Sequence, residues 1–401
     1  MQIDSRRVLI VTPQPFYEDR GTPIAVRYVA NALSEIGVEV DLLAFPIGKE
    51  VEIDHVTVSR CANLLGLRRV PIGFSWQKVV LDMSLWRAFA HRLATRQYSM
   101  VHAVEEAAYM ASVLCPRFNQ PFIYDMASAI PVELRTKRLL GSAPAQRMLQ
   151  SIERRVLRTA SHVVCSTGLA DYVRAQAPGT PVTEWRFPAI STPVDPAEVA
   201  VLRDELLLDP DQQVALYSGS FASYQGIDLL LEAFERARQS APDLVLVCVG
   251  ATDRDLVELA RQRPLDVDAN LRIVPRQPRE KIPAYIELAD FLVLPRVGGG
   301  NIPLKLYDYM ASGKPIVATR QAGNQALLDD TRAFICEPDA GSLAQAMVKA
   351  CSSPRKAAAV AHESAQFARR NFGWNPFVEF VGNTYSRAIG MDRLQDGNLA
   401  A

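Results

Sequence analysis

Two charged residues, Lys305 and Asp308, stand shortly after a run of three glycines at 298–300. Glycines let backbone N–H groups approach an anion closely, and a helix that starts after them adds the positive end of its dipole. Lys305 can reach the same anion, whereas the carboxylate three residues further on is better suited to accept sugar hydroxyls. The spacing predicts a nucleotide site, with a diphosphate on the glycine loop and a ribose on Asp308.

The elements around this pair must hold it at the edge of a sheet. Apolar runs at 291–295 and 316–318 predict two strands, and the residues from 301 onward predict a helix between them. The glycine loop then lies at the carboxyl end of a strand, where doubly wound sheets bind ligands. The alternative is a flexible surface loop followed by a solvated helical pair, and the strand–loop–helix context favours the anion site.

A second loop, near the start of the chain, has the same outline. Residues 7–12 predict a buried strand, residues 13–23 a loop, residues 24–36 a helix and residues 38–45 another strand. Gly21 and Thr22 stand where that helix begins, so the loop at 19–23 is a second candidate anion site. One glycine is a weak signal, because many strand-to-helix turns contain one.

Five polar residues follow other predicted strands in the first half of the chain: His102, Glu105, Glu106, Asp125 and Ser128. Strand ends carry the functional groups of doubly wound sheets, so we expect about two of the five to contact a substrate. The alternative for each is a helix cap or a structural hydrogen bond.

Residues 60–96 carry seven basic side chains and one acidic side chain, Asp82. An apolar stripe at helical spacing runs along the same segment: Trp76, Val79, Val80, Met83, Trp86, Ala90 and Leu93. A basic amphipathic helix with tryptophans can lie on an anionic membrane, which makes residues 68–96 a candidate membrane surface. The alternative is a helix that packs this stripe on the sheet and leaves a solvated basic back.

The composition is that of an ordinary soluble globular protein, with 401 residues, 49% hydrophobic and 22% charged. The 44 basic and 44 acidic side chains cancel, so no net field recruits nucleic acid. Six scattered cysteines fit neither a zinc ribbon nor a disulfide framework and indicate a reducing compartment. The N-terminus has no apolar signal core, and no run approaches the ~20 apolar residues of a membrane span. We therefore expect a cytoplasmic protein.

The strand–helix–strand pattern occurs twice, on either side of a proline-rich stretch at 186–196. The expected fold class is α/β, with two doubly wound, Rossmann-like domains facing across a cleft. We place the first domain at 1–188, a linker at 189–196, the second domain at 197–374, and a final helix at 375–390 that returns to the first domain.

The chain resembles the retaining glycosyltransferases of family 4, which have the two-domain architecture called GT-B. The likeness covers nearly the whole chain. Its most specific part is ADFLVLP followed by PLKLYDYMASGKPIVAT, and RVLIVT, GTPIAVRYVANALSEIGVEVDLL and YSGSFASYQGIDLLLEA match earlier family segments. The resemblance implies a nucleotide-sugar donor in the second domain, an acceptor in the first, and catalysis without a divalent metal.

Three places depart from the family pattern. The paired glutamates of the family map onto Gly300 and Asp308, so one carboxylate is kept for the ribose and backbone at 299–302 must contact the sugar. The arginine and lysine that grip the diphosphate in the family map onto Ser220 and Gln225. The histidine of the acceptor domain maps near Ala127.

The positive charge beside the diphosphate must then come from elsewhere, because negative charge builds on the departing phosphates. Lys305 is the first candidate, then Arg296 and the helix dipole, with Arg20 or Arg276 further away. Asp125 is a candidate for orienting the acceptor, and residues 275–277 for lining the base pocket. The donor-binding candidates are Gly21, Thr22, Gly219, Ser220, Gln225, Arg276, Gly299, Gly300, Asn301, Ile302, Pro303, Leu304, Lys305 and Asp308.

The expected function is that of a metal-independent, retaining hexosyltransferase with a UDP- or GDP-linked sugar as co-substrate and no other cofactor. Its acceptor would be a saccharide or lipid-linked intermediate of surface polysaccharide or glycolipid synthesis. The alternatives are a catalytically weak homologue that binds nucleotide sugar, and a GT-B-like nucleotide-sugar epimerase. The aspartate pairs at 253/255 and 266/268 have the spacing of a metal site but stand away from the phosphate loop.

Overall fold

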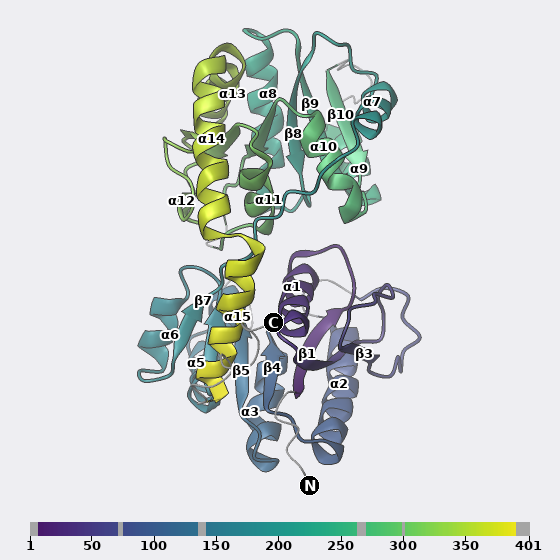
Figure 1. Ribbon diagram of the computed structural model, residues 1–401, viewed down its shortest axis with the longest axis vertical. Coiled ribbons are helices and arrows are strands. Elements are labelled where there is room, and N and C mark those ends of the chain that lie inside the picture. The colour runs from purple at the N-terminus through teal and green to yellow at the C-terminus, as the bar shows by residue number, and fades with distance from the viewer. Residues whose placement is uncertain (1–6, 71–74, 135–141, 263–269, 299–300, 390–401) are drawn as a thin grey trace, which may run out of the picture. The chain divides into compact units, whose positions relative to one another are not determined.

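Two parallel sheets form the framework of the protein. The computed structural model describes residues 7–70, 75–134, 142–262, 270–298 and 301–389. The chain divides into two compact units, unit 1 from Met1–Phe187 with Asn375–Ala401 and unit 2 from Pro188–Trp374. In each unit, parallel strands are flanked by helices (Figure 1). The predicted fold class, α/β with two Rossmann-like domains, is confirmed.

The sheet of unit 1 has the strand order β3-β2-β1-β4-β5-β6-β7 among the described residues. Its strands are β1 (Arg7–Pro15), β2 (Glu39–Phe45), β3 (Val56–Arg60), β4 (Met100–Val104), β5 (Phe122–Met126), β6 (His162–Cys165) and β7 (Val182–Glu184). Its helices are α1 (Gly21–Glu35), α2 (Trp76–Thr95), α3 (Ala107–Arg117), α4 (Ile130–Glu133), α5 (Ala143–Thr159) and α6 (Ala170–Gln176). The central strands are buried along their length, as a parallel sheet covered on both faces requires.

Strand β1 is longer than expected. We predicted that it ends at residue 12, but its pairing with β2 continues to Pro15, with a register shift between Thr12 and Pro15. Proline has no N–H to donate to a neighbouring strand, and an irregularity in the register is where a sheet tolerates it.

Helix α2 buries only part of the predicted stripe, since Leu93 is in the core and Trp86 and Ala90 pack against it. Leu81, Leu85 and Phe89 are buried against the core, whereas Trp76 and Met83 of the predicted stripe are 64% and 67% exposed. The helix carries two apolar rows, and only one of them can face the sheet. The prediction that the stripe packs on the sheet was therefore wrong for these two positions.

The sheet of unit 2 has the strand order β10-β9-β8-β11-β12-β13 within the residues described. Its strands are β8 (Gln213–Ser218), β9 (Leu244–Ala251), β10 (Leu271–Pro275), β11 (Phe291–Leu294), β12 (Ile316–Thr319) and β13 (Phe334–Cys336). Its α-helices are α7 (Pro196–Glu205), α8 (Ile227–Arg238), α9 (Asp253–Gln262), α10 (Ile282–Leu288), α11 (Leu304–Ser312), α12 (Ala322–Gln325), α13 (Ala340–Ser352) and α14 (Pro354–Asn371), and two 3₁₀ turns are η2 (Ser223–Gln225) and η3 (Arg279–Lys281). The sequence had indicated neither β13 nor the short strands β3 and β7.

The last helix, α15 (Trp374–Ile389), packs on unit 1. Phe377 meets Tyr28 of α1 edge to face, with ring centroids 6.3 Å apart. The hydroxyl of Tyr385 lies 2.7 Å from Nδ1 of His102 on β4. The final element of the chain thus completes the core of the first unit.

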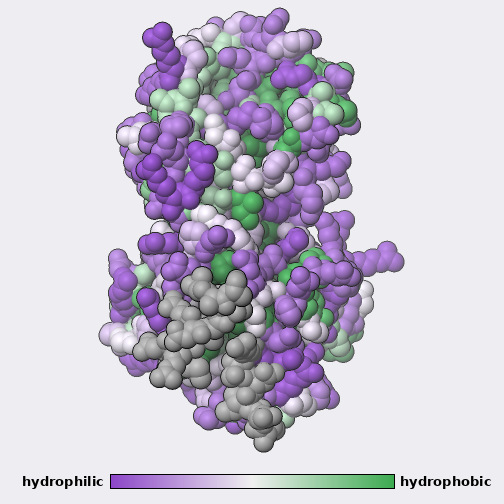
Figure 2. Space-filling view, in the orientation of Figure 1, coloured by the Kyte–Doolittle hydropathy of each residue, from purple (hydrophilic) through white to green (hydrophobic). Residues whose placement is uncertain are grey.

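The surface of both units is mostly hydrophilic on the face seen in Figure 2, with small separate hydrophobic areas. Most large apolar side chains lie in the two cores, around the sheets. In the part of the chain that the structure describes, no helix is both long and apolar enough to cross a membrane.

Candidate functional site

The candidate site lies in unit 2, where the strand order changes direction. Strand β8 pairs with β9 on one side and with β11 on the other, so connections leave β8 and β11 toward opposite ends of the sheet. Loops that follow such a pair diverge and leave a crevice at the carboxyl edge. Gly219 follows β8, residues 295–298 follow β11, and residues 301–303 lead into α11, so that a strand and then a helix stand on either side of this segment as the sequence predicted.

Lys305 occupies the second position of α11, at this crevice. Its Nζ lies 3.3 Å from Oε1 of Gln225 and 4.1 Å from the centre of the Tyr217 ring. A Cβ on Gly219 would lie 2.3 Å from the same Nζ, and Gly219 has a φ of 146°, so only glycine fits there. The segment that follows β8, some 80 positions before Lys305 in the sequence, therefore encloses its ammonium group.

The electrostatics of Lys305 favour an external anion. Burial, and then the neighbouring charge of Arg296, lower the pKa of Lys305 to about 7, and Cys248 acts in the opposite direction. Its hydrogen-bond partner is a neutral amide, and no carboxylate among the described residues forms an ion pair with it. A cation held without a counter-ion at a helix N-terminus is suited to bind phosphate oxygens.

Arg296 is almost completely buried, at 2% exposure, directly after β11. Its two Nη atoms donate to the carbonyl oxygen of Asn301 at 2.8 Å and to Oδ1 of Asn301 at 3.2 Å. The backbone oxygen of Arg296 in turn accepts from the hydroxyl of Thr319 at 2.6 Å. Arg296 thus braces the loop that begins α11, which is a positioning role beside Lys305.

Asp308, the predicted ribose ligand, is half-buried on α11 and forms an ion pair with Arg279 at 3.2 Å. Burial raises the pKa of Asp308 to about 6, and the charge and hydrogen bond of Arg279 oppose that rise. Sequence reasoning missed Arg279. The only local signal was its place two residues after the segment 275–277, which follows a strand and which we predicted to line the base pocket.

The other donor candidates of unit 2 are spread around this crevice. Gln225 is buried at the end of η2, and the backbone oxygen of Ser220 accepts from the Tyr217 hydroxyl at 2.6 Å. Asn301, Ile302, Pro303 and Leu304 form the entry to α11, with Pro303 as its N-cap residue. Arg276 is exposed after β10, and Gly299 and Gly300 lie outside the described residues. Contact of these residues with a donor stays a prediction.

An internal carboxyl group, that of Glu105, lies beside the candidate loop at 19–23 in unit 1. The carboxylate of Glu105, at the end of β4, accepts from Thr22 Oγ1 at 3.1 Å and from Gln14 Nε2 at 2.8 Å, and Arg20 donates to Gln14 at 2.8 Å. Glu105 has a φ of 48°, which is strained for a residue with a side chain. The place beside Gly21 and Thr22 that we predicted for a donor phosphate is therefore adjacent to an internal carboxylate.

Burial, with a further contribution from Glu106, raises the pKa of Glu105 to about 7, while its two hydrogen bonds and Lys78 oppose the rise. Glu106, the next residue, forms an ion pair with Lys78 of α2. Ser128 is half-buried just after β5. Acceptor contact by Glu105, Glu106 and Ser128 stays a prediction.

His102 and Asp125 form a buried network instead of an open site. Nε2 of His102 lies 3.2 Å from Asp125, whose other oxygen accepts from Trp185 Nε1 at 2.6 Å. The second ring nitrogen of His102 meets the hydroxyl of Tyr385, so both nitrogens are engaged. This geometry favours the structural alternative for His102 and Asp125, and an acceptor would have to displace one of these bonds.

The aspartates considered as a metal site do not converge. Asp255 caps its own helix by accepting from the backbone N–H and hydroxyl of Thr252, at 2.8 and 2.6 Å. Asp266 and Asp268 lie outside the described residues. Over the described ranges, no group of three or more His, Cys, Asp or Glu side chains has a geometry that could hold a metal ion.

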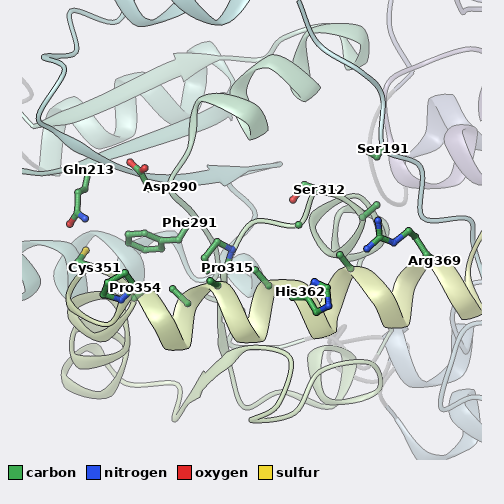
Figure 3. A pocket seen from close by; sticks show the side chains of 17 residues that line it. Ser191, Gln213, Asp290, Phe291, Ser312, Pro315, Cys351, Pro354, His362 and Arg369 are labelled. Atoms are coloured by element: carbon green, nitrogen blue, oxygen red, sulfur yellow. The ribbon is translucent and has the colours of Figure 1, made fainter. Parts of the chain in front are cut away.

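A cavity of about 730 Å³ lies on the opposite edge of the unit 2 sheet. It is lined by α14, including His362 and Arg369, and by the amino ends of β8 and β11, including Gln213 and Phe291 (Figure 3). Doubly wound sheets bind ligands at the carboxyl edge, so we assign the candidate site to the crevice around Lys305 and not to this cavity.

This combination of two doubly wound units and a switch-point crevice is that of a GT-B glycosyltransferase. Solved structures with this fold include sucrose-phosphate synthase from Thermosynechococcus elongatus, with a TM-score of 0.78, 19% identity and coverage of 96% of this chain and 99% of that chain. Another is Anabaena HepE in complex with UDP and glucose, with a TM-score of 0.73, 16% identity and coverage of 95% and 99%.

Sequence comparison gives the family. The family model described as "Glycosyl transferases group 1" matches residues 212–353, and the model described as "Glycosyl transferase 4-like domain" matches residues 20–184. The chain belongs to the family-4, group 1 glycosyltransferases of GT-B type.

Curated relatives of the chain are distant. The phosphatidyl-myo-inositol mannosyltransferase of Mycolicibacterium smegmatis is 24% identical over 84% of this chain and 80% of that protein. The D-inositol 3-phosphate glycosyltransferase of Segniliparus rotundus is 25% identical over 48% of this chain and 44% of that protein. The putative colanic acid biosynthesis glycosyl transferase WcaI of Escherichia coli is 31% identical over 31% of this chain and 31% of that protein, so the chain matches less than half the length of two of these relatives.

Proposed function

We propose that this glycosyltransferase moves a sugar from a nucleotide-diphosphate sugar, UDP- or GDP-linked, to a hydroxyl of a saccharide or lipid-linked acceptor, with retention of configuration. The observation that carries the proposal is the ammonium of Lys305, held at the N-terminus of α11 without a described counter-ion. The complexes of HepE with UDP and glucose and with UDP-glucose support a nucleotide sugar as donor.

In this mechanism, the bond between the anomeric carbon and the diphosphate oxygen breaks, and its electron pair leaves with the diphosphate. Lys305 and the positive end of α11 stabilise the negative charge that builds there. Arg296 keeps the loop in place through Asn301. The acceptor hydroxyl forms the new bond on the face that the diphosphate leaves, and its proton passes to the departing phosphate oxygen. This route requires no covalent enzyme intermediate.

Asp308 is assigned to the ribose hydroxyls, with Arg279 keeping its carboxylate charged at neutral pH. We further propose that catalysis needs no divalent metal, and that the protein acts at the cytoplasmic face of a membrane in polysaccharide or glycolipid synthesis. The Asp125 carboxylate, with both oxygens already paired, is proposed to orient the acceptor only through His102 or Trp185.

A thermal-shift panel of UDP, GDP, ADP and TDP tests the donor class. A nucleotide present at 100 times its Kd should add ~2.7 kcal/mol of stability. Lys305→Met should remove most of this shift, and Lys314→Met is the matched control, because Lys314 is paired with Glu287 at 3.5 Å at the other end of the helix. If no nucleotide shifts the wild-type protein, the proposed function is wrong.

Two further measurements test the finer points with whichever donor binds. The anomeric configuration of the product, followed by NMR before it mutarotates, decides between retention and inversion. Activity in the presence of EDTA, compared with activity after added Mg²⁺ or Mn²⁺, decides whether a divalent metal takes part. Inversion, or a loss of activity in EDTA that metal restores, would contradict the respective statement.

A further inference from the structure

Tyr224 places an aromatic ring at the surface beside the candidate site. It belongs to the 3₁₀ turn η2 and precedes Gln225, whose Oε1 lies 3.3 Å from Nζ of Lys305. The side chain of Tyr224 is 45% exposed. Single exposed apolar or aromatic residues are common on protein surfaces, and what distinguishes this one is its fixed position next to the proposed anion site.

The backbone of η2 is fixed to the segment that follows β11. The carbonyl oxygen of Tyr224 accepts from the N–H of Val297 at 3.1 Å. A Cβ on Gly226 would lie 2.0 Å from the carbonyl oxygen of Pro295, and Gly226 has a φ of 75°, so only glycine allows the two segments to approach this closely. A Cβ on Gly298 would make an ordinary contact of 3.5 Å with Cβ of Tyr224. The two backbones therefore set the place of the ring.

Arg296 connects this ring to the entry of α11. Its guanidinium lies over the Tyr224 ring, with Cζ 5.6 Å from the ring centre, and the same guanidinium donates to Asn301. Val297 is 44% exposed, and Asn301 is exposed as well. Three solvent-accessible side chains thus surround one buried arginine, and we refer to Tyr224, Val297 and Asn301 together as the rim.

The rim and Asp308 lie on opposite sides of Lys305. Under the proposed function, on which this inference rests, Lys305 binds the diphosphate and Asp308 the ribose. Asp308 lies three residues further into α11, about 4.5 Å along the helix axis, whereas the rim lies at the segments that precede the helix. A nucleotide sugar carries its sugar and its ribose at opposite ends of the diphosphate. The sugar therefore extends from Lys305 toward the rim.

We propose that Tyr224 binds the transferred sugar by stacking its ring against the C–H face of a pyranose. The face of an aromatic ring is negative, and the C–H groups of a pyranose present an apolar, slightly positive surface to it. The side-chain amide of Asn301 stands on the same rim and can hydrogen-bond hydroxyls at the edge of the sugar. A nucleobase would also stack on an aromatic ring, but it belongs to the ribose end, toward Arg279 and Asp308.

Comparison of a nucleoside diphosphate with its sugar conjugate isolates this contact. Calorimetric titration of the full-length protein, without acceptor, gives the Kd of UDP and UDP-glucose and of GDP and GDP-mannose. For the pair that the wild type binds, Tyr224→Ala should weaken the sugar nucleotide about five- to tenfold, the size of one lost aromatic contact, and leave the diphosphate alone unchanged. Tyr224→Phe should retain the wild-type values, whereas Tyr224→Leu, which keeps apolar area but no ring, should weaken only the sugar nucleotide.

Val201→Ala is the matched control, since Val201 is 57% exposed on α7, and it should change neither Kd. Thermal unfolding should be the same in all variants, because the carbonyl group of Tyr224 holds η2 in place. Should Tyr224→Ala not fold, Tyr224→Phe against Tyr224→Leu decides. Equal loss for diphosphate and conjugate would assign the ring to the base, and no loss for either would leave it a cover for Arg296, so each result overturns the proposal. A wild type that binds neither diphosphate contradicts the proposed function itself, which is a distinct failure.

Discussion

The first turns of α1 and α11 follow central strands of the two sheets, β1 in unit 1 and β11 in unit 2, and each lies near a glycine, Gly21 or Gly298. At α1, the carboxyl group of Glu105 accepts from Thr22 and Gln14, so an internal carboxyl group already occupies this place. At α11, the basic group is Lys305, and its hydrogen-bond partner is the neutral Gln225. One helix start thus faces an internal carboxyl group and the other a lysine without an ion-pair partner among the described residues, which is why we propose that the external anion binds at α11.

The test with the largest expected effect removes the amino group of Lys305. Lys305→Met should lower turnover by at least ~10²-fold, the size typical of deleting one group that stabilises transition-state charge. Steady-state kinetics with the donor found in the thermal-shift panel measures the effect, with Lys314→Met as control. Near-normal turnover of Lys305→Met would show that Lys305 takes no part in the mechanism. The proposed difference between the two units would then have no functional meaning.

A second test moves the positive charge from position 305 to position 225. Because Oε1 of Gln225 lies 3.3 Å from Nζ of Lys305, a lysine at 225 can present its ammonium to nearly the same place. Gln225→Lys combined with Lys305→Met should recover about tenfold of the turnover lost in Lys305→Met, since the field at the crevice is restored but its geometry is not. A double variant that binds nucleotide yet is no faster than Lys305→Met would show that position, and not charge, is decisive.

Arg279→Met tests the second ion pair of α11. Without the guanidinium, Asp308 loses the partner that opposes the burial-induced rise of its pKa, so a smaller fraction of it is ionised near neutral pH. The expected result is a donor KM raised about five- to tenfold with kcat nearly unchanged, as for a contact made equally in the ground and transition states. The increase in KM should be larger at pH 6 than at pH 8, and a fall in kcat alone would argue against the ribose assignment.

The smallest expected effect lies in unit 1. The folded-state pKa of Glu105, about 7, is above the usual value of 4.5, so the native state favours the neutral carboxyl. Its contribution to stability is fully present below pH 4.5 and is lost as the pH rises through about 7. The free energy of unfolding of the wild type, relative to Glu105→Gln, should therefore fall by roughly 1–2 kcal/mol between pH 5 and pH 8. Denaturant titrations at these pH values measure it, and a difference independent of pH would mean that Glu105 is charged throughout.

The strands and the helix that form the site were predictable from the sequence, whereas the residues that pair with Lys305, Asp308 and Glu105 were not. Apolar runs without alternation placed β8 and β11, and the change of pattern after 298–300 placed α11, because these signals are local in the sequence. The pairs that define the electrostatics join residues that are 80, 29 and 83 positions apart: Gln225 with Lys305, Arg279 with Asp308, and Thr22 with Glu105. Spacing rules compare neighbours along a helix or strand, so they contain no information about such contacts.

Helix α2 is a second case in which the sequence pattern alone does not determine which side chains are buried. Its sequence offers two apolar rows, and periodicity alone does not say which one the sheet covers. The structure buries the row of Leu81, Leu85 and Phe89 and leaves Trp76 in solvent. What periodicity cannot supply is the position of the neighbouring strands.

The bond between Tyr385 and His102 has a consequence for biosynthesis. The two residues are 283 positions apart, and the whole of unit 2 is encoded between them. A ribosome releases Pro188–Trp374 as one uninterrupted stretch that can reach its native form as it emerges. The part of unit 1 that is synthesised first, Met1–Phe187, has an incomplete core until residues 375–389 leave the exit tunnel. A nascent chain halted before that point should contain a finished second lobe and a first lobe that proteases still cut.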